Sequence, residues 1–297
     1  MVHYNKCPLC NSTVIVHHLM CRDHFLSGEE FELVRCPSCS MIFTQDHPDE
    51  NNAGKYYDSA EYASHHDENK NLLNRIYRIA RGIMLSRKRR LIRKITGKDK
   101  GRLLDIGSGS GHFLFEMKKS GWDVCGIEIN DQVRNLSINR FGLNVLTTEK
   151  LNSLPTEYYD CITLWHVLEH FQDPFFYGYH INRLLKPGGI CIAAVPNSKS
   201  YDAGHYKAFW AAYDVPRHLW HFNPDTFIRF SEIAGLKLIR IYTLPLDVFY
   251  ISALSERYRG IRMHFIRAMM ISSWFWFLTL FNKNKSSSLI YILRKQR

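Results

Sequence analysis

The sequence predicts an α/β fold in which helices flank a mostly parallel sheet, preceded by a small cysteine-rich module. From Arg102 onward, short apolar runs alternate with helical patterns, which is the signature of a parallel sheet. Five of the eight cysteines lie in the first forty residues. The stretch "LLDIGSGSGHF", Leu103 to Phe113, places glycines directly after an apolar run, at the sheet edge where such folds bind ligands.

The composition is that of a globular protein. The chain has 297 residues, of which 45% are apolar and 23% are charged, enough for a sizeable core in one large or two modest domains. The N-terminal residues lack the basic-then-apolar pattern of a signal peptide. We therefore expect a cytoplasmic protein, with cysteines that are reduced or bound to metal rather than paired in disulfides.

The net charge of +11 is unevenly distributed along the chain. Residues 71–102 carry 12 basic side chains and one acidic one, and residues 257–297 carry nine basic side chains and no acidic one. The remainder is mildly acidic. Basic segments of this kind can contact phosphate in nucleic acid, in lipid headgroups or in nucleotide-linked substrates.

The predicted elements follow from apolar runs and helix stop signals. A helix is expected over residues 71–95 because apolar residues recur there at roughly helical spacing. Later helices should end at Gly121, at Gly142 and at Pro187–Gly189. The stretch "SSLIYILRK" predicts the final strand. The other predicted strands are Leu103–Ile106, Asp123–Ile129, Leu143–Thr147, Cys161–Leu164 and Ile190–Val195.

The N-terminal cysteines predict a metal site. "CPLC" and "CPSC" form two CxxC pairs separated by 25 residues, and four thiolates suit tetrahedral zinc, most often in a structural role. Cys21 and His24 lie between the pairs and are alternative ligands, and disulfides or free thiols are the other interpretations. The cysteines of the predicted zinc site are Cys7, Cys10, Cys36 and Cys39. The three cysteines inside predicted strands, Cys125, Cys161 and Cys191, are expected to be buried apolar thiols.

The glycine-rich stretch predicts a cofactor site. Glycines let a ligand approach the backbone closely, but the dinucleotide fingerprint needs a glycine at its sixth position, where this chain has His112. Asp105 precedes the first glycine by two residues and would repel a pyrophosphate. Glu128 follows the second strand, where an acid can accept both hydroxyls of a ribose. A ribose at Glu128 and an amino acid group near Asp105 together describe S-adenosylmethionine.

At this point the sequence resembles the class I S-adenosylmethionine-dependent methyltransferases. The matching stretches are "LLDIGSGSG", "VCGIEIN", "YYDCITLWHVLEH" and "LLKPGGICIAAVPN", in the family's order and spacing. The resemblance covers Arg102 to Asn197 and implies a Rossmann-like sheet. It also implies the cofactor-binding residues, which are Asp105, Gly107, Gly109, Gly111, Glu128, Ile129 and Trp165. The acid that many relatives place near the adenine amino group has only Glu149 as a counterpart here.

Two segments offer residues for the chemistry. The stretch "WHVLEH" supplies His166, Glu169 and His170, which would share one face of a helix. It resembles a stretch of quinone-biosynthesis O-methyltransferases that has been linked to divalent metal and substrate binding. His166 and His170 are therefore predicted to handle protons, with a second divalent metal near Glu169. The alternative is that Glu169 and His170 only brace the helix.

The second segment is "FWAAYDVPRHLWHF", Phe209 to Phe222. An arginine and a histidine in such a loop can bind an anionic substrate group and take a proton, so His218 is the third predicted proton-handling residue. The alternative is that Arg217 and His218 staple the loop by hydrogen bonds. This segment resembles one in uncharacterised bacterial methyltransferases that share the cysteine module. Upstream, a flap over the cofactor is predicted from Tyr56, Tyr57 and Tyr62.

The two basic segments each have two interpretations. The helix over 71–95 is expected to be an amphipathic connector that packs on the core, with contact to phosphate as the alternative. Residues 268–281, "AMMISSWFWFLTLF", are fourteen apolar or small residues, too few to span about 30 Å of hydrocarbon. We expect a buried or substrate-covering helix here, with peripheral membrane contact through residues 262–285 as the alternative.

The sequence thus predicts a methyltransferase with three parts. Residues 1–60 form a zinc-ribbon module and flap, residues 61–100 a basic helical connector, and residues 101–297 a methyltransferase domain with a C-terminal substrate-covering insertion. The acceptor is expected to be a small molecule or a lipid- or sugar-linked one, with O-methylation slightly favoured over C-methylation. An RNA methyltransferase and a non-catalytic zinc-containing binding module are the alternatives.

Overall fold

The fold is organised around one large mixed sheet. The computed structural model describes the backbone of residues 1–57 and 72–296, and the side chains of residues 1–57 and 81–296. Within these residues the large sheet has seven strands, and β11 alone runs opposite to the others, because it pairs antiparallel with both of its neighbours, β8 and β10. In spatial order they are β10 (Leu236–Thr243), β11 (Ser288–Lys295), β8 (Leu185–Pro196), β7 (Tyr159–Trp165), β4 (Arg102–Ile106), β5 (Asp123–Ile127) and β6 (Val145–Leu146).

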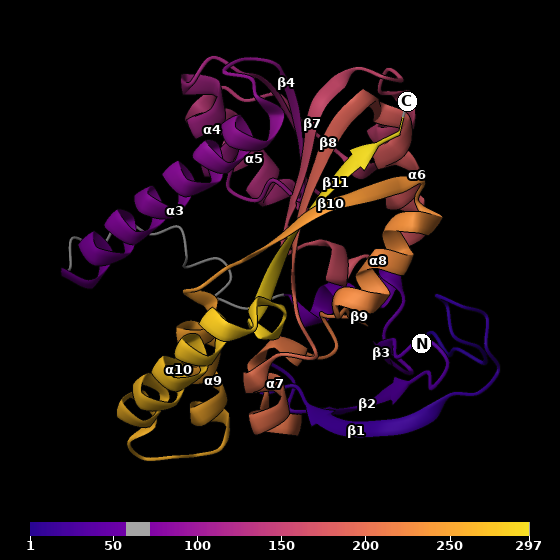
Figure 1. Ribbon diagram of the computed structural model, residues 1–297, viewed down its shortest axis with the longest axis vertical. Coiled ribbons are helices and arrows are strands. Elements are labelled where there is room, and N and C mark those ends of the chain that lie inside the picture. Colours follow the sequence, from indigo (N-terminus) through magenta and orange to yellow (C-terminus); the bar gives the residue numbers. More distant parts are fainter. Residues whose placement is uncertain (58–71, 297) are drawn as a thin grey trace.

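Helices cover both faces of this sheet (Figure 1). One face carries α3 (Leu72–Thr96), α4 (His112–Lys119) and α5 (Asp131–Phe141), and the other carries α6 (Pro174–Leu184) and α8 (Pro224–Ile233). The strands are apolar on both sides, since Leu103 packs with the first set and Leu104 with the second. This two-sided burial explains why parallel strands are near-continuous apolar runs. Cys125, Cys161 and Cys191 are buried as predicted.

The helix ends show why these segments begin and end where they do. Asn130 caps α5 by accepting a hydrogen bond from the Val133 N–H group, and Gly142 ends it in the left-handed conformation, as expected for a C-terminal glycine. Asn223 and Thr226 form a capping box at the start of α8. The predicted stop at Pro187–Gly189 is wrong, because α6 ends at Leu184 and β8 already begins at Leu185, which pairs with Tyr159.

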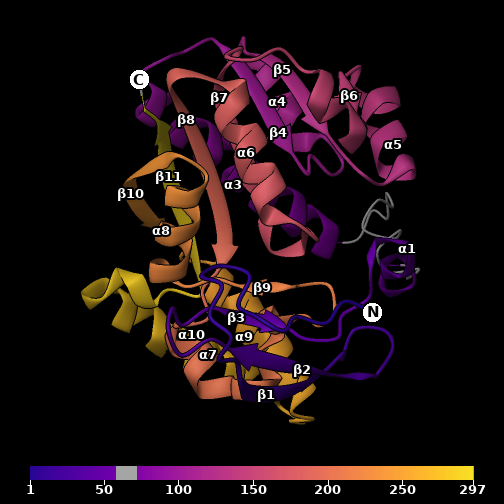
Figure 2. The ribbon, with the colours of Figure 1, turned by 90° about the vertical axis from the view of Figure 1, so that its right-hand side faces the viewer.

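The N-terminal residues form a second, smaller sheet with a strand from far along the chain. Among the described residues this sheet has four strands, and Phe43 pairs with Trp220. Figure 2 shows it beneath the carboxyl end of the parallel strands. The cysteine module is therefore joined to the C-terminal half by backbone pairing. In order the strands are β1 (Val16–Arg22), β2 (Glu30–Arg35), β3 (Ile42–Thr44) and β9 (Trp220–His221).

Helix α3 packs against the core through an apolar stripe that includes the fully buried Ile92. Two of its basic side chains pair with acids of the domain itself: Arg89 Nε lies 3.3 Å from Glu116 Oε1, and Arg93 Nε lies 2.5 Å from Asp99 Oδ1. The amphipathic connector that the sequence predicted agrees with this packing. Contact of the remaining charges with phosphate stays a prediction.

The segment between the last two strands contains α9 (Asp247–Tyr258) and α10 (His264–Phe281), which lie side by side in both views (Figures 1 and 2). Helix α10 is the one described helix that is long and apolar enough, by length and composition, to cross a membrane. Only Ala268, Ser272 and Phe275 of its residues are buried. The expectation of a buried helix is therefore wrong, because most of its surface faces outward; that the helix covers the substrate stays a prediction.

The remaining elements are short and connect these layers. The α-helices among them are α1 (Glu50–Ala53) and α7 (Tyr201–Tyr206). The 3₁₀ turns are η1 (Gly54–Tyr56), η2 (Thr148–Ser153), η3 (Leu168–His170), η4 (Lys207–Phe209), η5 (Ala211–Tyr213) and η6 (Lys283–Lys285).

Candidate functional site

The turn between β4 and α4, here called the glycine loop (Gly107–Gly111), lies at the carboxyl end of the parallel strands. All three of its glycines have positive φ angles, between 52° and 76°, a region that other residues rarely adopt. A Cβ atom on Gly107 would lie 2.4 Å from Val167 Cγ2, whereas one on Gly109 would meet nothing within 4 Å. Gly107 is thus needed for close packing, and Gly109 borders open space.

Two carboxylates flank the glycine loop. Asp105 is 2% exposed, and its Oδ1 accepts a hydrogen bond of 2.6 Å from Thr163 Oγ1. Burial raises the pKa of Asp105 to about 7, although the bond from Thr163 and the nearby Lys88 ammonium act to lower it. Glu128 Oε2 accepts a hydrogen bond of 2.8 Å from the Gly109 N–H group. This bond fixes the carboxylate across the loop, with Ile129 beside it and 66% exposed.

Lys88 of α3 belongs to this edge and was not predicted. Its Nζ lies 4.1 Å from the centroid of a Trp165 ring, and burial lowers its pKa to about 8 while Asp105 and Asp247 act to raise it. A signal for it was available, because position 88 falls on the same helical face as Leu85 and Ile92. A cation on the apolar stripe of a helix is placed toward the core rather than toward water.

A cavity of about 160 Å³ opens beside Lys88. It lies where α3 approaches the end of β7 and the turn from β10 into α9, and its walls are mainly apolar. Trp165 Nε1 has no hydrogen-bond partner among the described residues. The lining residues are Met84, Arg87, Lys88, Leu91, Trp165, Tyr242, Thr243, Leu244, Pro245, Leu246, Asp247 and Ile290.

The stretch "WHVLEH" does not form the predicted helix. His166 has a φ angle of +56°, and only Leu168 to His170 form a single 3₁₀ turn. His166 and Glu169 nevertheless come together, with 3.6 Å between Nδ1 and Oε1. The other ring nitrogen, Nε2, lies 3.3 Å from Asp247 Oδ2 at the start of α9. Asp247 is a second residue that the sequence did not reveal, because it lies 81 positions away with no motif around it.

His166 is an ion-paired imidazolium in this arrangement. Burial alone would lower its pKa, but the hydrogen bond from its ring to Asp247 and the proximity of Glu169 raise the pKa to about 10. The pKa values of both carboxyl groups fall below their ordinary range, because the charge of His166 outweighs the effect of burial. A histidine that keeps its proton at neutral pH is a donor and a positioning cation rather than a general base.

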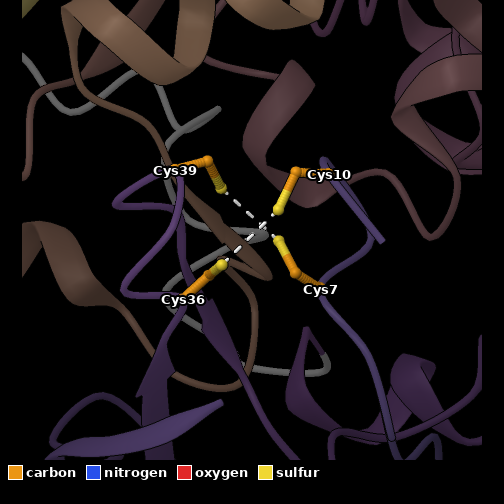
Figure 3. Close-up of side chains that lie close together, drawn as sticks. All are labelled: Cys7, Cys10, Cys36 and Cys39. Atoms are coloured by element: carbon orange, nitrogen blue, oxygen red, sulfur yellow. Dashed lines mark hydrogen bonds between the residues drawn. The ribbon is translucent and has the colours of Figure 1, made fainter. Parts of the chain in front are cut away.

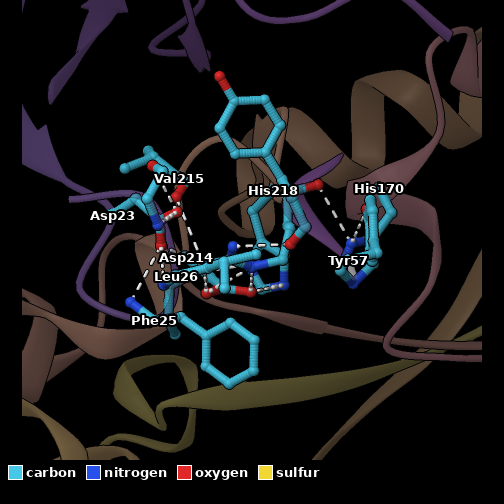
Figure 4. Close-up of polar contacts among 12 residues, drawn as sticks. Asp23, Phe25, Leu26, Tyr57, His170, Asp214, Val215 and His218 are labelled. Carbon is cyan, nitrogen blue, oxygen red and sulfur yellow. Dashed lines mark hydrogen bonds and ion pairs between the residues drawn. The ribbon is translucent and has the colours of Figure 1, made fainter. Parts of the chain in front are cut away.

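Glu169, His170 and His218 form what we call the imidazole cluster. Their ligand atoms lie within 4.8 Å of one another. The carboxylate of Glu169 is fully buried, and both its oxygens lack a hydrogen-bond partner among the described residues. The centroids of the two imidazole rings lie 4.5 Å apart at a steep angle. The cluster draws on two segments, and Figure 4 shows His170 and His218 among the polar contacts around it.

The hydrogen bonds of these two histidines fix their tautomers. His170 Nδ1 lies 3.1 Å from the Arg217 carbonyl oxygen, and His218 Nδ1 lies 2.8 Å from the Ala212 carbonyl oxygen. A carbonyl can only accept, so each Nδ1 carries a hydrogen, and in the neutral ring the lone pair lies on Nε2. Burial, together with the proximity of His218, lowers the pKa of His170 to about 4. His170 is therefore a neutral imidazole at physiological pH.

Arg217 is an internal staple rather than a binding group. It is 5% exposed, and its Nη2 lies 2.8 Å from Asp23 Oδ1 and 2.7 Å from Asp214 Oδ1. Its Nη1 donates to the Tyr56 carbonyl oxygen at 3.1 Å. The interpretation that Arg217 binds an anionic substrate group is wrong, because its donors are used within the protein. The staple ties the loop before β9 to the N-terminal module.

The predicted flap is described in part. The Tyr56 hydroxyl donates to Glu29 Oε2 at 2.6 Å, and the Tyr57 hydroxyl lies 3.2 Å from His170 Nδ1. Tyr57 thus reaches the imidazole cluster. Tyr62 lies outside the described residues.

The four N-terminal cysteines converge as predicted (Figure 3). Their sulfur atoms lie within 4.8 Å of one another, with 3.5 Å between Cys7 and Cys39 and between Cys10 and Cys36. Zn–S bonds of about 2.3 Å in a tetrahedron separate sulfurs by about 3.8 Å, close to these distances. We call these four residues the cysteine cluster. The alternative ligands lie elsewhere, since Cys21 is buried in β1 and His24 stacks on Tyr258 at 4.5 Å.

Comparison with known proteins identifies the family. A model of the methyltransferase domain matches residues 75–241, more than half of the chain. The chain belongs to the methyltransferase domain family. This finding confirms the predicted class I S-adenosylmethionine-dependent fold, and the match includes the glycine loop and the imidazole cluster.

Similar curated sequences include ubiquinone biosynthesis O-methyltransferases. The protein of Cereibacter sphaeroides is 33% identical over 147 residues, which are 46% of this chain and 60% of that protein. The one of Paramagnetospirillum magneticum is 30% identical over 145 residues, 45% of this chain and 56% of that protein. The match thus spans about three fifths of the length of these relatives.

Solved structures show the same fold at low sequence identity. A putative sarcosine dimethylglycine methyltransferase from Galdieria sulphuraria superimposes with a TM-score of 0.51 at 17% identity, covering 71% of this chain and 86% of that one. A phosphoethanolamine N-methyltransferase 2 from Haemonchus contortus, in complex with S-adenosyl-L-methionine, gives 0.50 at 16% identity, covering 71% and 53%. These likenesses establish the methyltransferase sheet of this chain.

Proposed function

We propose that this chain transfers the methyl group of S-adenosylmethionine to an oxygen atom of a small-molecule acceptor. The observation that carries the proposal is the cofactor edge, where a glycine loop bordering open space lies between Asp105 and Glu128. Family membership and the similar ubiquinone biosynthesis O-methyltransferases support it. They also favour oxygen over carbon as the methylated atom.

The residues at this edge fit the cofactor. The open space at Gly109 and the exposed Ile129 leave room for a nucleoside beside Glu128. Glu128 would hold the ribose hydroxyls and Ile129 would cover the adenine. Asp105 offers a carboxyl group and Lys88 an amine at the other end, where the amino and carboxylate groups of a methionine moiety need partners. When bound, the cofactor supplies an electrophilic methyl group on a sulfonium sulfur.

The imidazole cluster would deal with the acceptor's proton. A hydroxyl that attacks a methyl group must lose its proton, and a neutral imidazole with a free lone pair can take it. His170 has that lone pair on Nε2, and His218 has it there whenever its ring is neutral. His166 would remain charged and hold Glu169 and Asp247 in place, so its role is positioning rather than proton removal.

We infer that the acceptor has an apolar part, as a lipid-linked acceptor does. The cavity beside Trp165 is lined mainly by apolar side chains, and Asp247, the partner of His166, is one of its few polar lining residues. A hydrocarbon portion would fill this cavity and present a hydroxyl toward the imidazole cluster. A bare sugar would leave its hydroxyls unpaired against these walls, at a cost in binding energy.

The cysteine cluster would bind one structural zinc ion. Its spacing in the sequence, its sulfur separations and its distance in the chain from the glycine loop all support this role. As an alternative to proton removal by its imidazoles, the imidazole cluster fits a divalent cation, since one buried carboxylate and two imidazole nitrogens are a common ligand set. A cation bound there would lower the pKa of the acceptor hydroxyl. The three-part division of the chain at residues 60 and 100 is likewise our proposal.

Native mass spectrometry of the protein purified without added ligand tests these assignments. We expect added mass for one zinc ion together with S-adenosylmethionine or its demethylated product. Zinc without any nucleotide, even after excess cofactor is added, would overturn the enzyme proposal. Methylation of simple phenols with linear alkyl chains of increasing length then tests the acceptor class, because the Michaelis constant should fall as the chain lengthens. A value that is independent of chain length would contradict the apolar acceptor.

A further inference from the structure

Helix α10 presents its bulkiest apolar side chains to the outside of the protein. The stripe facing inward contains the buried Ala268 and Ser272, which are small, the buried Phe275, and the half-buried Ile271 and Leu278. Surface helices of globular proteins normally bury the apolar stripe and expose polar residues. Helix α10 instead exposes many of its large apolar side chains. The exposed apolar side chains of α10 and of its N-cap residue are Met263, Phe265, Ile266, Met269, Met270, Trp274, Trp276, Phe277, Leu280 and Phe281.

The exposed face is continuous and uncharged along nearly the whole helix. At 1.5 Å per residue its 18 residues extend about 27 Å, and no charged residue lies between Arg267 and Lys283. Exposure reaches 70% at Met270, 59% at Trp274 and 78% at Phe281. Apolar patches of this extent on a soluble surface mark a binding partner.

Basic side chains lie at both ends of this face. Arg262 and Lys283 are exposed, Lys285 is half-buried, and residues 257–297 contain no acid. Arg267 is not free for a partner, because its Nε lies 3.1 Å from Oε2 of the buried Glu256. This ion pair links α10 to α9, and we call these two helices the helical hairpin. The partner of this surface must therefore be apolar in the middle and negatively charged at its edges.

An anionic bilayer has that pattern, and a second copy of this chain does not. A two-fold dimer through α10 would bring the same basic flanks together without an acid to pair them. In a bilayer interface, aromatic rings lie at the headgroup level and arginine or lysine contacts lipid phosphates. The helix does not need to cross the bilayer, because Phe275 anchors one side of it in the protein core.

We propose that α10 docks the protein flat on the surface of an anionic membrane. Its exposed aromatic and methionine side chains enter the boundary between headgroups and acyl chains, and Arg262, Lys283 and Lys285 contact lipid phosphates. The helical hairpin begins at Asp247, which lines the apolar cavity. Docking on this face would therefore bring that cavity close to the membrane. The docking itself does not depend on methyl transfer.

Flotation of the full-length protein with vesicles tests the docking. We expect it to float with phosphatidylcholine vesicles that contain phosphatidylglycerol, and to bind much more weakly to vesicles of phosphatidylcholine alone. Trp274→Glu and Met270→Glu should each weaken the partition roughly tenfold or more, because a charge replaces a side chain that would be buried in lipid. The matched control is Ile233→Glu, since Ile233 is 54% exposed at the end of α8.

The basic flanks are tested separately. Arg262→Gln and Lys283→Gln should each weaken binding to the anionic vesicles about fivefold, with loss of most of the salt dependence in the double variant. Arg229→Gln on α8 is the matched control and should leave the partition unchanged. Equal binding of the double variant would overturn the assignment of the phosphate contacts.

Two outcomes overturn the proposal as a whole. One is wild-type protein that floats with neither kind of vesicle, or floats as well when Trp274 is replaced by Glu. The other is concentration-dependent dimerisation in sedimentation velocity that Trp274→Glu abolishes, without vesicle binding, which would assign the face to a second copy. Calorimetric titration with S-adenosylmethionine should give the same affinity for wild type and Trp274→Glu. Failure of the proposed enzymatic function would be visible there and not in flotation.

Discussion

The glycine loop and the imidazole cluster lie at the same end of the sheet, but the chain builds them in opposite ways. The loop and its two carboxylates come from one stretch, Asp105 to Glu128. The cluster joins Glu169 and His170 to His218, nearly fifty residues later, and is held by Arg217, whose partner Asp23 lies in the N-terminal module. A contiguous motif keeps its geometry through local backbone constraints. A site assembled from distant segments, such as the imidazole cluster, depends on the tertiary contacts that position each segment.

This difference predicts that damage to the N-terminal module reaches the imidazole cluster and spares the glycine loop. The connection is visible in hydrogen bonds, since Thr44 Oγ1 donates to the His218 carbonyl oxygen at 2.8 Å and the Thr44 N–H group donates to the Leu219 carbonyl oxygen at 3.0 Å. No comparable bond joins the glycine loop to that module among the described residues.

The largest expected effect is loss of the zinc site. Cys36→Ser should remove the metal and lower the free energy of unfolding by roughly 5 kcal/mol or more, because a structural zinc ion contributes its binding energy to folding. Metal content by elemental analysis and urea unfolding measure this, with Cys21→Ala as a control that keeps the zinc. Where the protein remains folded, affinity for S-adenosylmethionine should change less than about twofold, because distant sites contribute independently. A large loss of cofactor affinity would show that the glycine loop also depends on the N-terminal module.

The next effect is removal of the buried staple. Arg217→Met should lower the free energy of unfolding by about 3–5 kcal/mol, because it leaves the buried carboxylate of Asp23 without its partner. Urea unfolding measures the loss. Arg93→Met is the control, since the exposed pair of Arg93 with Asp99 should contribute less than about 1 kcal/mol. A similar loss in both variants would show that Arg217 is not a special link between the module and the cluster.

A smaller and more local effect is expected at the glycine loop. Gly109→Ala should weaken S-adenosylmethionine binding roughly tenfold, because the added methyl group would enter the space assigned to the cofactor. The control is Gly188→Ala, which has a similar positive φ angle and open surroundings at the far end of the sheet. Isothermal titration calorimetry should find normal affinity in the control, with comparable melting temperatures for the two variants. Unchanged affinity in Gly109→Ala would place the cofactor elsewhere.

The smallest effect is a pair of opposite pH dependences in the histidines. The pKa of His166 is raised to about 10, so its contribution to stability is fully present below pH 6.5 and is lost as the pH rises toward 10. The pKa of His170 is lowered to about 4, so the fold loses stability as the pH falls from 6.5 toward 4. Stability curves of His166→Gln and His170→Gln against wild type should show these opposite trends.

Imidazole nitrogen NMR at neutral pH gives an independent check of this difference. We expect a doubly protonated His166 and a neutral His170 with the hydrogen on Nδ1. A neutral His166 would return it to the role of general base that the sequence suggested.

Much of the cofactor edge could be predicted from sequence because each step is local. The positive φ angles demand glycine, the strand before them is an apolar run, and Glu128 ends the next strand at the same edge. The cysteine cluster was predictable for a similar reason. Each CxxC pair is a local motif, and the two pairs need only to meet once to complete the site. Lys88 and Asp247 were missed because their roles depend on contacts with residues far away in the sequence, Trp165 and His166.

The sequence by itself determined the parallel sheet, the glycine loop with its carboxylates and the four clustered cysteines. Only the tertiary structure decided that "WHVLEH" is a turn rather than a helix, that Arg217 is a buried staple, and that α10 turns its aromatic side outward. The physical reason is that backbone conformation and periodicity are encoded over a few residues. Burial and pairing of a charge depend on segments that the chain brings together from far apart, and no local pattern reports them.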